Sequence, residues 1–227
     1  MAGPVSWHRF ATLADASEAL AEAVAVRLRE LLAAKGRALL AVPGGTTPAR
    51  FLAALGQRDL AWDKVTLLPT DERFVAADDP ASNERMIRAQ FAPLADGRVA
   101  FLSFHDHGSD IVAAAAALNA KFVTLPPPDL LVSGMGPDGH IASLFPGEEA
   151  TFNAEPAGGI VIARPPGLPP RLSLSLERLL DAGWAGLLIS GEAKETVLKE
   201  APERGTPLPV DRLLDRGQGL DVYWAKE

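Results

Sequence analysis

Four polar loops carry residue types that bind anions and move protons, and each follows a short apolar run. The first is Pro43–Pro48, in which Gly44 and Gly45 would let the backbone approach a ligand closely. Thr46 and Thr47 add hydroxyl groups. With Thr47 as the N-cap, this loop would open a helix whose free N–H groups form an anion site. The alternative is a well-capped turn with no ligand.

The second loop, Thr70–Arg73, places three consecutive charges at the end of an apolar run. Charged groups in such a position are seldom buried without partners. The planar guanidinium of Arg73 suits a phosphate, and Asp71 and Glu72 would accept hydrogen bonds from hydroxyls or hold neighbouring groups in place. A solvated turn is the alternative. Asn83, further along, is a candidate both for capping a helix and for contacting a ligand.

The third loop, Ser133–Gly147, contains a literal G-x-G-x-x-G whose last two glycines are Gly136 and Gly139. This pattern raises the possibility of a dinucleotide fold. Two features argue against it. Only a short stretch separates the last glycine from Pro146, too short for the long helix that the fold requires. Asp138 would also bring a negative charge to the place of the pyrophosphate.

The same loop offers acid–base chemistry through Asp138 and His140. Histidine titrates near neutral pH and can take a proton from water. A nearby carboxylate can orient the ring and stabilise its cation, although two residues so close in sequence need not touch. The glycines would let the loop fold tightly around a small ligand.

The fourth loop leads from the apolar run Ala185–Ile189 into a predicted helix whose first turn contains Lys194. A cation there opposes the helix dipole and favours a compensating anion such as phosphate. Arg171, after two prolines, is a further cation whose role its spacing leaves open. The run His105–His107 is predicted to be a surface loop rather than a metal site. No G-x-S-x-G motif marks a serine esterase, and Ser143 has no base in that arrangement.

These loops must be positioned by the elements around them, and the chain alternates between apolar runs and helical patterns. The alternation predicts βαβ units and a mainly parallel sheet with both faces covered. Ligands of such sheets bind at the carboxyl ends of the strands, where the four loops would converge. The predicted strands are Arg37–Val42, Lys64–Leu68, Val99–Leu102, Asp129–Val132, Gly159–Ala163, Ala185–Ser190 and Leu220–Trp224. The predicted helices are Asp15–Ala34, Pro48–Leu55, Asn83–Phe91, Ser109–Phe122 and Glu192–Glu200.

The whole chain, 227 residues and 48% apolar, fits one α/β domain spanning residues 1–227. It has no cysteine, which excludes disulfides and thiolate chemistry. The first residues lack the regions of a signal peptide and no run is long enough to cross a membrane, so we expect a cytoplasmic protein with no membrane partner. The net charge of −7 argues against nucleic acid as a partner. Binding an anion would require positive potential concentrated locally.

Three of these segments resemble the 6-phosphogluconolactonases in order and spacing: Val42–Pro48, Asp71–Arg73 with Ser82-Asn83, and Gly134–Gly147. Gly191 with Lys194 resembles the late lysine of that family. The resemblance spans nearly the whole chain, and the G-M-G-P-D-G-H-I-A-S-L-F-P-G segment is its most specific part. The related glucosamine-6-phosphate isomerases/deaminases share the Asp-Gly-His core, but there the loop continues into Phe-Asn-Glu-Pro rather than Ser-Leu-Phe-Pro. Ile141, where lactonases commonly have Thr, and Thr46, where many have Ser, are small departures.

The resemblance implies a single three-layer α/β domain with a modified Rossmann-type sheet. It also implies hydrolysis of 6-phospho-D-glucono-1,5-lactone to 6-phosphogluconate, a step of the oxidative pentose phosphate pathway. In this interpretation the first loop, Arg73 and Lys194 hold the phosphate, and His140, helped by Asp138, takes a proton from water. Backbone N–H groups of the glycine loops would stabilise the oxyanion, and neither a metal nor a cofactor is needed. An isomerase or deaminase and a non-catalytic sugar-phosphate sensor stay open, and we expect a monomer or a small homo-oligomer.

Overall fold

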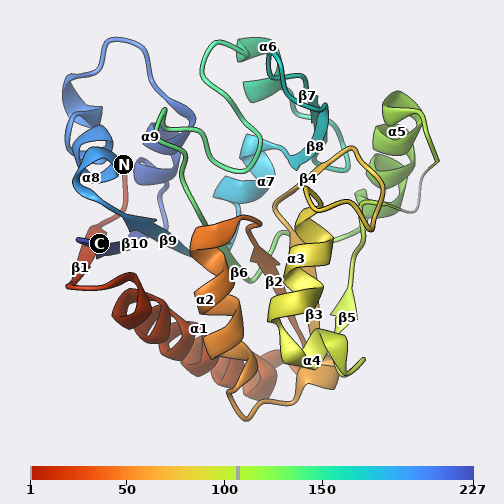
Figure 1. Cartoon of the computed structure of the whole chain (residues 1–227), viewed down its shortest axis with the longest axis vertical. Helices are drawn as coiled ribbons and strands as arrows, with labels where there is room; N and C mark the ends of the chain where they lie inside the picture. The colour runs from red at the N-terminus through yellow and green to blue at the C-terminus, as the bar shows by residue number, and fades with distance from the viewer. Residues whose placement is uncertain (1, 106–107) are drawn as a thin grey trace.

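The structure is a computed structural model, and it describes residues 2–105 and 108–227. Its centre is a seven-stranded sheet in the order β1-β10-β9-β6-β2-β3-β5, in which every neighbouring pair is parallel (Figure 1). The bounds of these strands are β1 Val5–Phe10, β2 Ala38–Val42, β3 Val65–Pro69, β5 Ala100–Phe101, β6 Leu130–Ser133, β9 Trp184–Ser190 and β10 Leu220–Ala225. The predicted mainly parallel α/β sheet is therefore confirmed.

Helices connect the strands. They are α1 Leu13–Lys35, α2 Thr46–Gly56, α3 Asn83–Gln90, α4 Ala92–Ala95, α5 Ile111–Phe122, α6 Glu149–Phe152, α7 Leu176–Leu180, α8 Glu192–Lys199 and α9 Pro209–Leu214, with short 3-10 turns η1 Trp62–Lys64 and η2 Ala201–Glu203. The longest, α1, begins after Thr12, whose hydroxyl accepts from the amide of Asp15, and ends at Gly36 with φ 71°. All five predicted helices are present, with ends that differ by a few residues.

The sheet separates two apolar layers, as its alternating side chains require. In β2, for example, Leu40 packs with α1 and α2, whereas Leu39 and Ala41 pack on the opposite face. The first layer contains buried residues of α1, α2, α3 and α4. The second contains buried residues of α5, α6, α7, α8 and α9 (Figure 1). Helices thus cover both faces, which gives the three-layer arrangement.

A second, three-stranded sheet was not predicted. It is antiparallel, in the order β4-β8-β7, and consists of β4 Asp71–Arg73, β7 Ile160–Ala163 and β8 Arg171–Leu174. The predicted loop at Asp71–Arg73 is therefore a strand, and the predicted strand Gly159–Ala163 belongs to this small sheet rather than to the parallel one. Its buried residues, including Leu172 and Leu174, join the second apolar layer.

The strand order reverses between β2 and β6. From β2 the chain adds β3 and β5 on one side, and from β6 it adds β9 and β10 on the other, with β1 outermost. The loops after β2 and β6 therefore leave the sheet side by side at a topological switch point, where open α/β sheets bind ligands. These are the first and third polar loops of the sequence.

Candidate functional site

A cavity of about 220 Å³ lies at this switch point. Its walls come from the ends of β2, β6 and β9, from the small sheet and from the first residues of α2, α3 and α8. Eleven of the thirteen predicted site residues line it: Gly44, Gly45, Thr46, Thr47, Asp71, Arg73, Asn83, Gly136, His140, Arg171 and Lys194. Asp138 and Gly139 do not line the cavity, although they directly precede His140 in the same loop. Segments far apart in sequence thus meet at one place, while the role of each residue stays a prediction.

The loop after β2 enters α2 earlier than predicted. The helix begins at Thr46, and its N-cap is Gly45, with φ 98° and no side-chain capping bond. The prediction of Thr47 as N-cap is therefore wrong, because Thr47 already lies inside the helix. No capping side chain accepts hydrogen bonds from the first N–H groups of α2. These groups lie at the cavity, where they can bind an anion instead.

Gly44 has a steric reason to be glycine. A Cβ atom at this position would overlap the side chain of Asn83, which lies directly against the backbone. Asn83 itself is the first residue of α3, and the side chain that caps this helix is Ser82, so the capping role considered for Asn83 is wrong. Instead its Nδ2 donates to the backbone oxygen of Asp71 at 2.9 Å. Asn83 is therefore bonded to β4 and packs against the loop after β2.

Asp71 is a buried carboxyl at the cavity wall. Ser143 donates to its Oδ2 at 2.5 Å, and Thr70 and Asn83 donate to its Oδ1, each at 3.3 Å. Burial raises the pKa of Asp71, while the hydrogen bond from Ser143 and the charges of Arg73 and Arg171 act in the opposite direction. With these neighbours Asp71 is held in one orientation and can also accept a hydrogen bond from a ligand hydroxyl.

Arg73 and Arg171 are partners across β4 and β8, so their side chains leave the small sheet on the same face. Arg73 donates from Nη1 to the backbone oxygen of Ala81 at 2.5 Å. Arg171 lies with its guanidinium 5.2 Å from the ring centre of Phe145 and its Nη1 3.5 Å from the hydroxyl of Ser143. In both arginines the Nε atom is buried and has no acceptor among the residues that the structure describes. Two adjacent cations with unused donors favour an anion between or beside them.

Lys194 provides a cation from the opposite side of the switch point. It is the third residue of α8, whose N-cap Gly191 has φ 87° and no capping side chain. Burial lowers the pKa of Lys194, and within residues 2–105 and 108–227 no carboxylate forms an ion pair with it. A partly buried ammonium at a helix N-terminus is poorly stabilised by the protein alone, so an anionic ligand would supply the missing partner.

His140 and Asp138 are in direct contact, with Nδ1 of the ring 2.6 Å from Oδ1 of the carboxylate. An ionised carboxylate only accepts, so Nδ1 carries the hydrogen and Nε2 has the lone pair. Asp138 is half-exposed and lies outside the cavity, whereas the histidine lines it. The ring also contacts Phe145 at 4.6 Å between centroids. The pair is built to accept a proton at Nε2 and to stabilise the resulting imidazolium.

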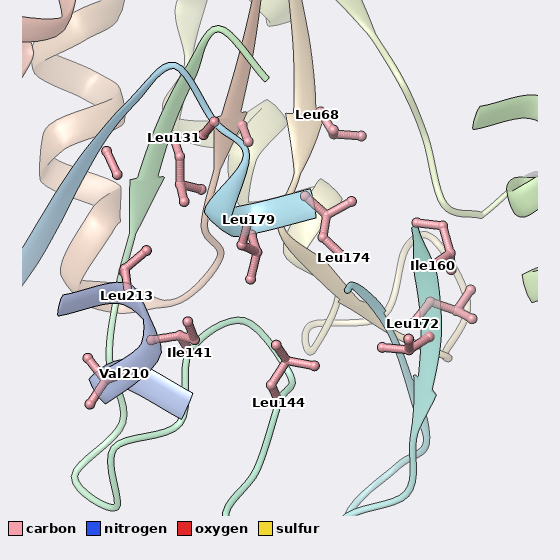
Figure 2. Packing of buried hydrophobic residues seen from close by; sticks show 14 of the residues in the cluster. Leu68, Leu131, Ile141, Leu144, Ile160, Leu172, Leu174, Leu179, Val210 and Leu213 are labelled. Carbon is pink, nitrogen blue, oxygen red and sulfur yellow. The ribbon is translucent and has the colours of Figure 1, made fainter. Parts of the chain in front are cut away.

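The loop around His140 is held in a fixed shape. Its backbone closes on itself through the bond from the amide of Gly136 to the oxygen of His140, at 2.9 Å. A Cβ atom at Gly136 would overlap the imidazole ring, so only glycine fits beneath it. Ile141 and Leu144 are buried, and Figure 2 shows Ile141 beside Val210 and Leu213 of α9. Apolar anchors thus follow the catalytic candidate directly and fix its position.

Several residues of the site were not predicted. Ser143, considered only as a nucleophile, is fully buried and serves as the donor to Asp71. The ring of Phe145 contacts both the imidazole of His140 and the guanidinium of Arg171. Ala142, a non-glycine residue with φ 49°, also lines the cavity. Ser143 and Phe145 were visible in the sequence only as members of the motif, because their partners lie on distant elements.

The predicted surface loop at His105–His107 needs a correction. His105 is largely buried, and its Nε2 lies 3.0 Å from Oε2 of Glu72 and 3.0 Å from the hydroxyl of Ser82. Residues 106–107 lie outside the described residues. In the described part of the chain, no group of three His, Asp or Glu side chains could hold a metal ion. No described helix is both long and apolar enough to span a membrane.

Comparisons with known proteins agree with this architecture. Residues 11–224 match the family model described as glucosamine-6-phosphate isomerases/6-phosphogluconolactonase. A 6-phosphogluconolactonase of Mesorhizobium japonicum is 40% identical, covering 97% of this chain and 95% of its own length. One of Rhizobium meliloti is 37% identical, covering 96% of this chain and 97% of its own. The crystal structure of a 6-phosphogluconolactonase from Shewanella baltica superposes with a TM-score of 0.89 at 29% identity, and covers 99% of both chains.

Proposed function

The chain belongs to the family of glucosamine-6-phosphate isomerases and 6-phosphogluconolactonases, and within it we propose that the protein hydrolyses 6-phospho-D-glucono-1,5-lactone to 6-phospho-D-gluconate. This reaction is a step of the oxidative pentose phosphate pathway. The observation that carries the proposal is the Asp138–His140 pair at a cavity that also holds three cationic side chains, Arg73, Arg171 and Lys194. A base for water and a site for a phosphate are the two things that the reaction needs.

His140 acts as the general base in this proposal. Its Nε2 takes a proton from a water molecule as the oxygen of that water attacks the lactone carbonyl. Asp138, bonded to Nδ1 at 2.6 Å, stabilises the imidazolium that forms. When the ring ester bond breaks, the leaving oxygen needs one proton and the imidazolium holds one. Transfer of that proton restores the neutral ring and completes the reaction without a metal or an organic cofactor.

The phosphate binds to the cationic walls in this proposal. Lys194 and the free N–H groups at the start of α2 line the cavity, and so do the two arginines of the small sheet. The sugar hydroxyls have Asp71 and Asn83 as partners. The backbone N–H group of Gly44 is at the cavity and is a candidate for stabilising the oxyanion, whereas that of Gly136 already donates to the backbone oxygen of His140. The substrate is thereby oriented by its charged end while the carbonyl faces the histidine.

We further propose that residues 1–227 form one domain, because the small sheet shares its apolar core with the large one. The substrate carries a phosphate and does not cross membranes freely, which favours the cytoplasm as the place of action. A monomer or small homo-oligomer is consistent with a cavity to which one chain contributes all the residues named above.

The test is a pH-stat assay with freshly prepared lactone, corrected for spontaneous hydrolysis, since each turnover releases an acid. We expect turnover that is unaffected by EDTA. Activity lost in EDTA and restored by one metal would contradict the mechanism. Conversion of glucosamine 6-phosphate instead of the lactone would identify an isomerase or deaminase, and tight binding of 6-phosphogluconate without turnover would identify a sensor.

A further inference from the structure

Glu72 lies in the middle of β4, between two residues that line the cavity, yet it does not line the cavity itself. Successive side chains of a strand point to opposite faces. Asp71 and Arg73 therefore face the cavity and Glu72 faces away from it. Its side chain is 2% exposed, so a charge has been placed in the interior beside the site without being able to touch a ligand there.

Five hydrogen-bond donors surround this carboxylate. Oε1 accepts from the backbone amides of Arg73 at 2.8 Å and Asn83 at 2.7 Å. Oε2 accepts from the amide of Glu84 at 2.7 Å and the hydroxyl of Ser82 at 3.1 Å, and Nε2 of His105 lies 3.0 Å away. Burial acts to raise the pKa of Glu72, but the hydrogen bonds from His105, Glu84 and Asn83 outweigh burial and lower it. The group is thus a carboxylate held in one orientation.

The two bonds to Oε1 join β4 to the first turn of α3, at the two residues whose side chains enter the cavity. Two further contacts close the same connection: Arg73 donates to the backbone oxygen of Ala81, and Asn83 donates to that of Asp71. A negative charge at the N-terminus of a helix is also favourable in itself. Removing the charge would therefore loosen the strand and the helix at the point where Arg73 and Asn83 are fixed.

We infer that Glu72 is a positioning residue, which holds Arg73 and Asn83 at the cavity wall through its buried carboxylate and never contacts the substrate. The inference rests on the proposed function, because it assigns to these two residues the binding of a phosphorylated sugar. Its consequence is specific: loss of Glu72 should weaken substrate binding and leave the proton transfer at His140 nearly intact.

The variant Glu72→Gln tests this, because an amide NH2 in place of one oxygen leaves at least one of the buried donors without an acceptor. We expect the KM for the lactone to rise about 10-fold while kcat changes less than about 3-fold. Glu84→Gln is the matched control. Glu84 lies on the same first turn and is also buried, but its carboxylate contacts Ser103 and Arg88 and neither cavity residue. Its KM should stay within about 2-fold of the wild type.

A double-mutant cycle separates positioning from a general loss of structure. If Glu72 acts through Arg73, Glu72→Gln should weaken binding of 6-phosphogluconate much less in an Arg73→Ala background than in the wild type. The inference would be overturned if the two substitutions weakened 6-phosphogluconate binding additively. It would also be overturned if Glu72→Gln lowered kcat and left KM unchanged. Should Glu72→Gln fail to fold, Ser82→Ala, which removes one donor to Oε2, must shift KM in the same direction.

Calorimetric binding of 6-phosphogluconate requires no turnover, so it keeps the two proposals apart. Absent lactone hydrolysis in the wild type would defeat the proposed function alone. Unchanged affinity for 6-phosphogluconate in a folded Glu72→Gln protein would defeat the positioning role alone.

Discussion

At the scale of single residues, the site depends on how charges are partnered. Asp138 and Asp71 are both carboxylates near the cavity, but the first is half-exposed and bonded to an imidazole, while the second is buried among neutral donors and two arginines. The environment, rather than the residue type, is therefore the reason that we assign proton transfer to the first pair and a positioning role to the second carboxyl.

His140→Ala is expected to lower kcat by about 10²–10⁴-fold, the usual contribution of a general base. Binding of 6-phosphogluconate should survive, because the cationic side chains that we assign to the phosphate are untouched. Steady-state kinetics and calorimetry measure the two effects. His8→Ala is a matched control, since His8 also pairs with a carboxylate, Asp221 at 3.1 Å, and does not line the cavity. An unchanged kcat in His140→Ala would remove the histidine from the mechanism.

At the scale of elements, six of the seven parallel strands and five helices could be predicted from the sequence, because their apolar patterns are long enough to be distinctive. The edge strand β1, Val5–Phe10, was missed, and none of its residues is fully buried. The short elements were missed for physical reasons. β4 consists of Asp-Glu-Arg. Its first two residues are charged and buried, and they are stabilised by partners on α3 and on the third loop, Ser133–Gly147, while the strand itself pairs with β8. No local pattern signals a strand stabilised by distant donors. β8 was missed for a similar reason. The strand has only four residues, which are too few to show an alternating apolar pattern in the sequence.

The candidate site was easier to predict than the small sheet that completes it. The glycine loops placed Gly44, His140 and Lys194 at one edge, because loops at the carboxyl ends of parallel strands lie side by side. The contacts of Ser143 with Asp71 and of Phe145 with Arg171 depend on how the third loop meets β4 and β8. That meeting is tertiary, so the sequence could name the loop but not its internal partners.

Gly136→Ala is the prediction for the histidine loop. A Cβ atom there would overlap the ring of His140 and approach Asp138, so the pair must move apart. We expect kcat to fall by at least about 10-fold, because moving a catalytic base by up to about 1 Å slows the reaction strongly. The affinity for 6-phosphogluconate should change little. Gly205→Ala is the control, since a Cβ atom at Gly205 meets nothing within 4 Å. Wild-type kcat in Gly136→Ala would contradict the tight packing beneath the ring.

At the scale of the whole molecule, the net charge of −7 sets the protein against its proposed substrate. The long-range field repels a phosphate, so binding must come from groups that act at short range. The cavity provides them by concentrating Arg73, Arg171 and Lys194 at one switch point while its own carboxylate, Asp71, is occupied by neutral donors. If the proposed function holds, these local cations must outweigh the repulsive field of the molecule at the cavity.

Arg73→Ala and Lys194→Ala test this balance. Each should weaken 6-phosphogluconate binding by about 10- to 150-fold, as expected for one charge-assisted interaction, and barely affect unphosphorylated gluconate. Lys199→Ala, on the same helix as Lys194 but exposed and paired with Glu195, should change neither. Equal weakening of both ligands would place the two cations at the sugar ring or in the support of the fold. In the wild type, raising salt from about 50 to 500 mM screens the repulsion and only the exposed part of the attraction. The dissociation constant should therefore change by less than about 3-fold, whereas a steep fall in affinity would mean that the phosphate lies open to solvent rather than between Lys194 and the start of α2.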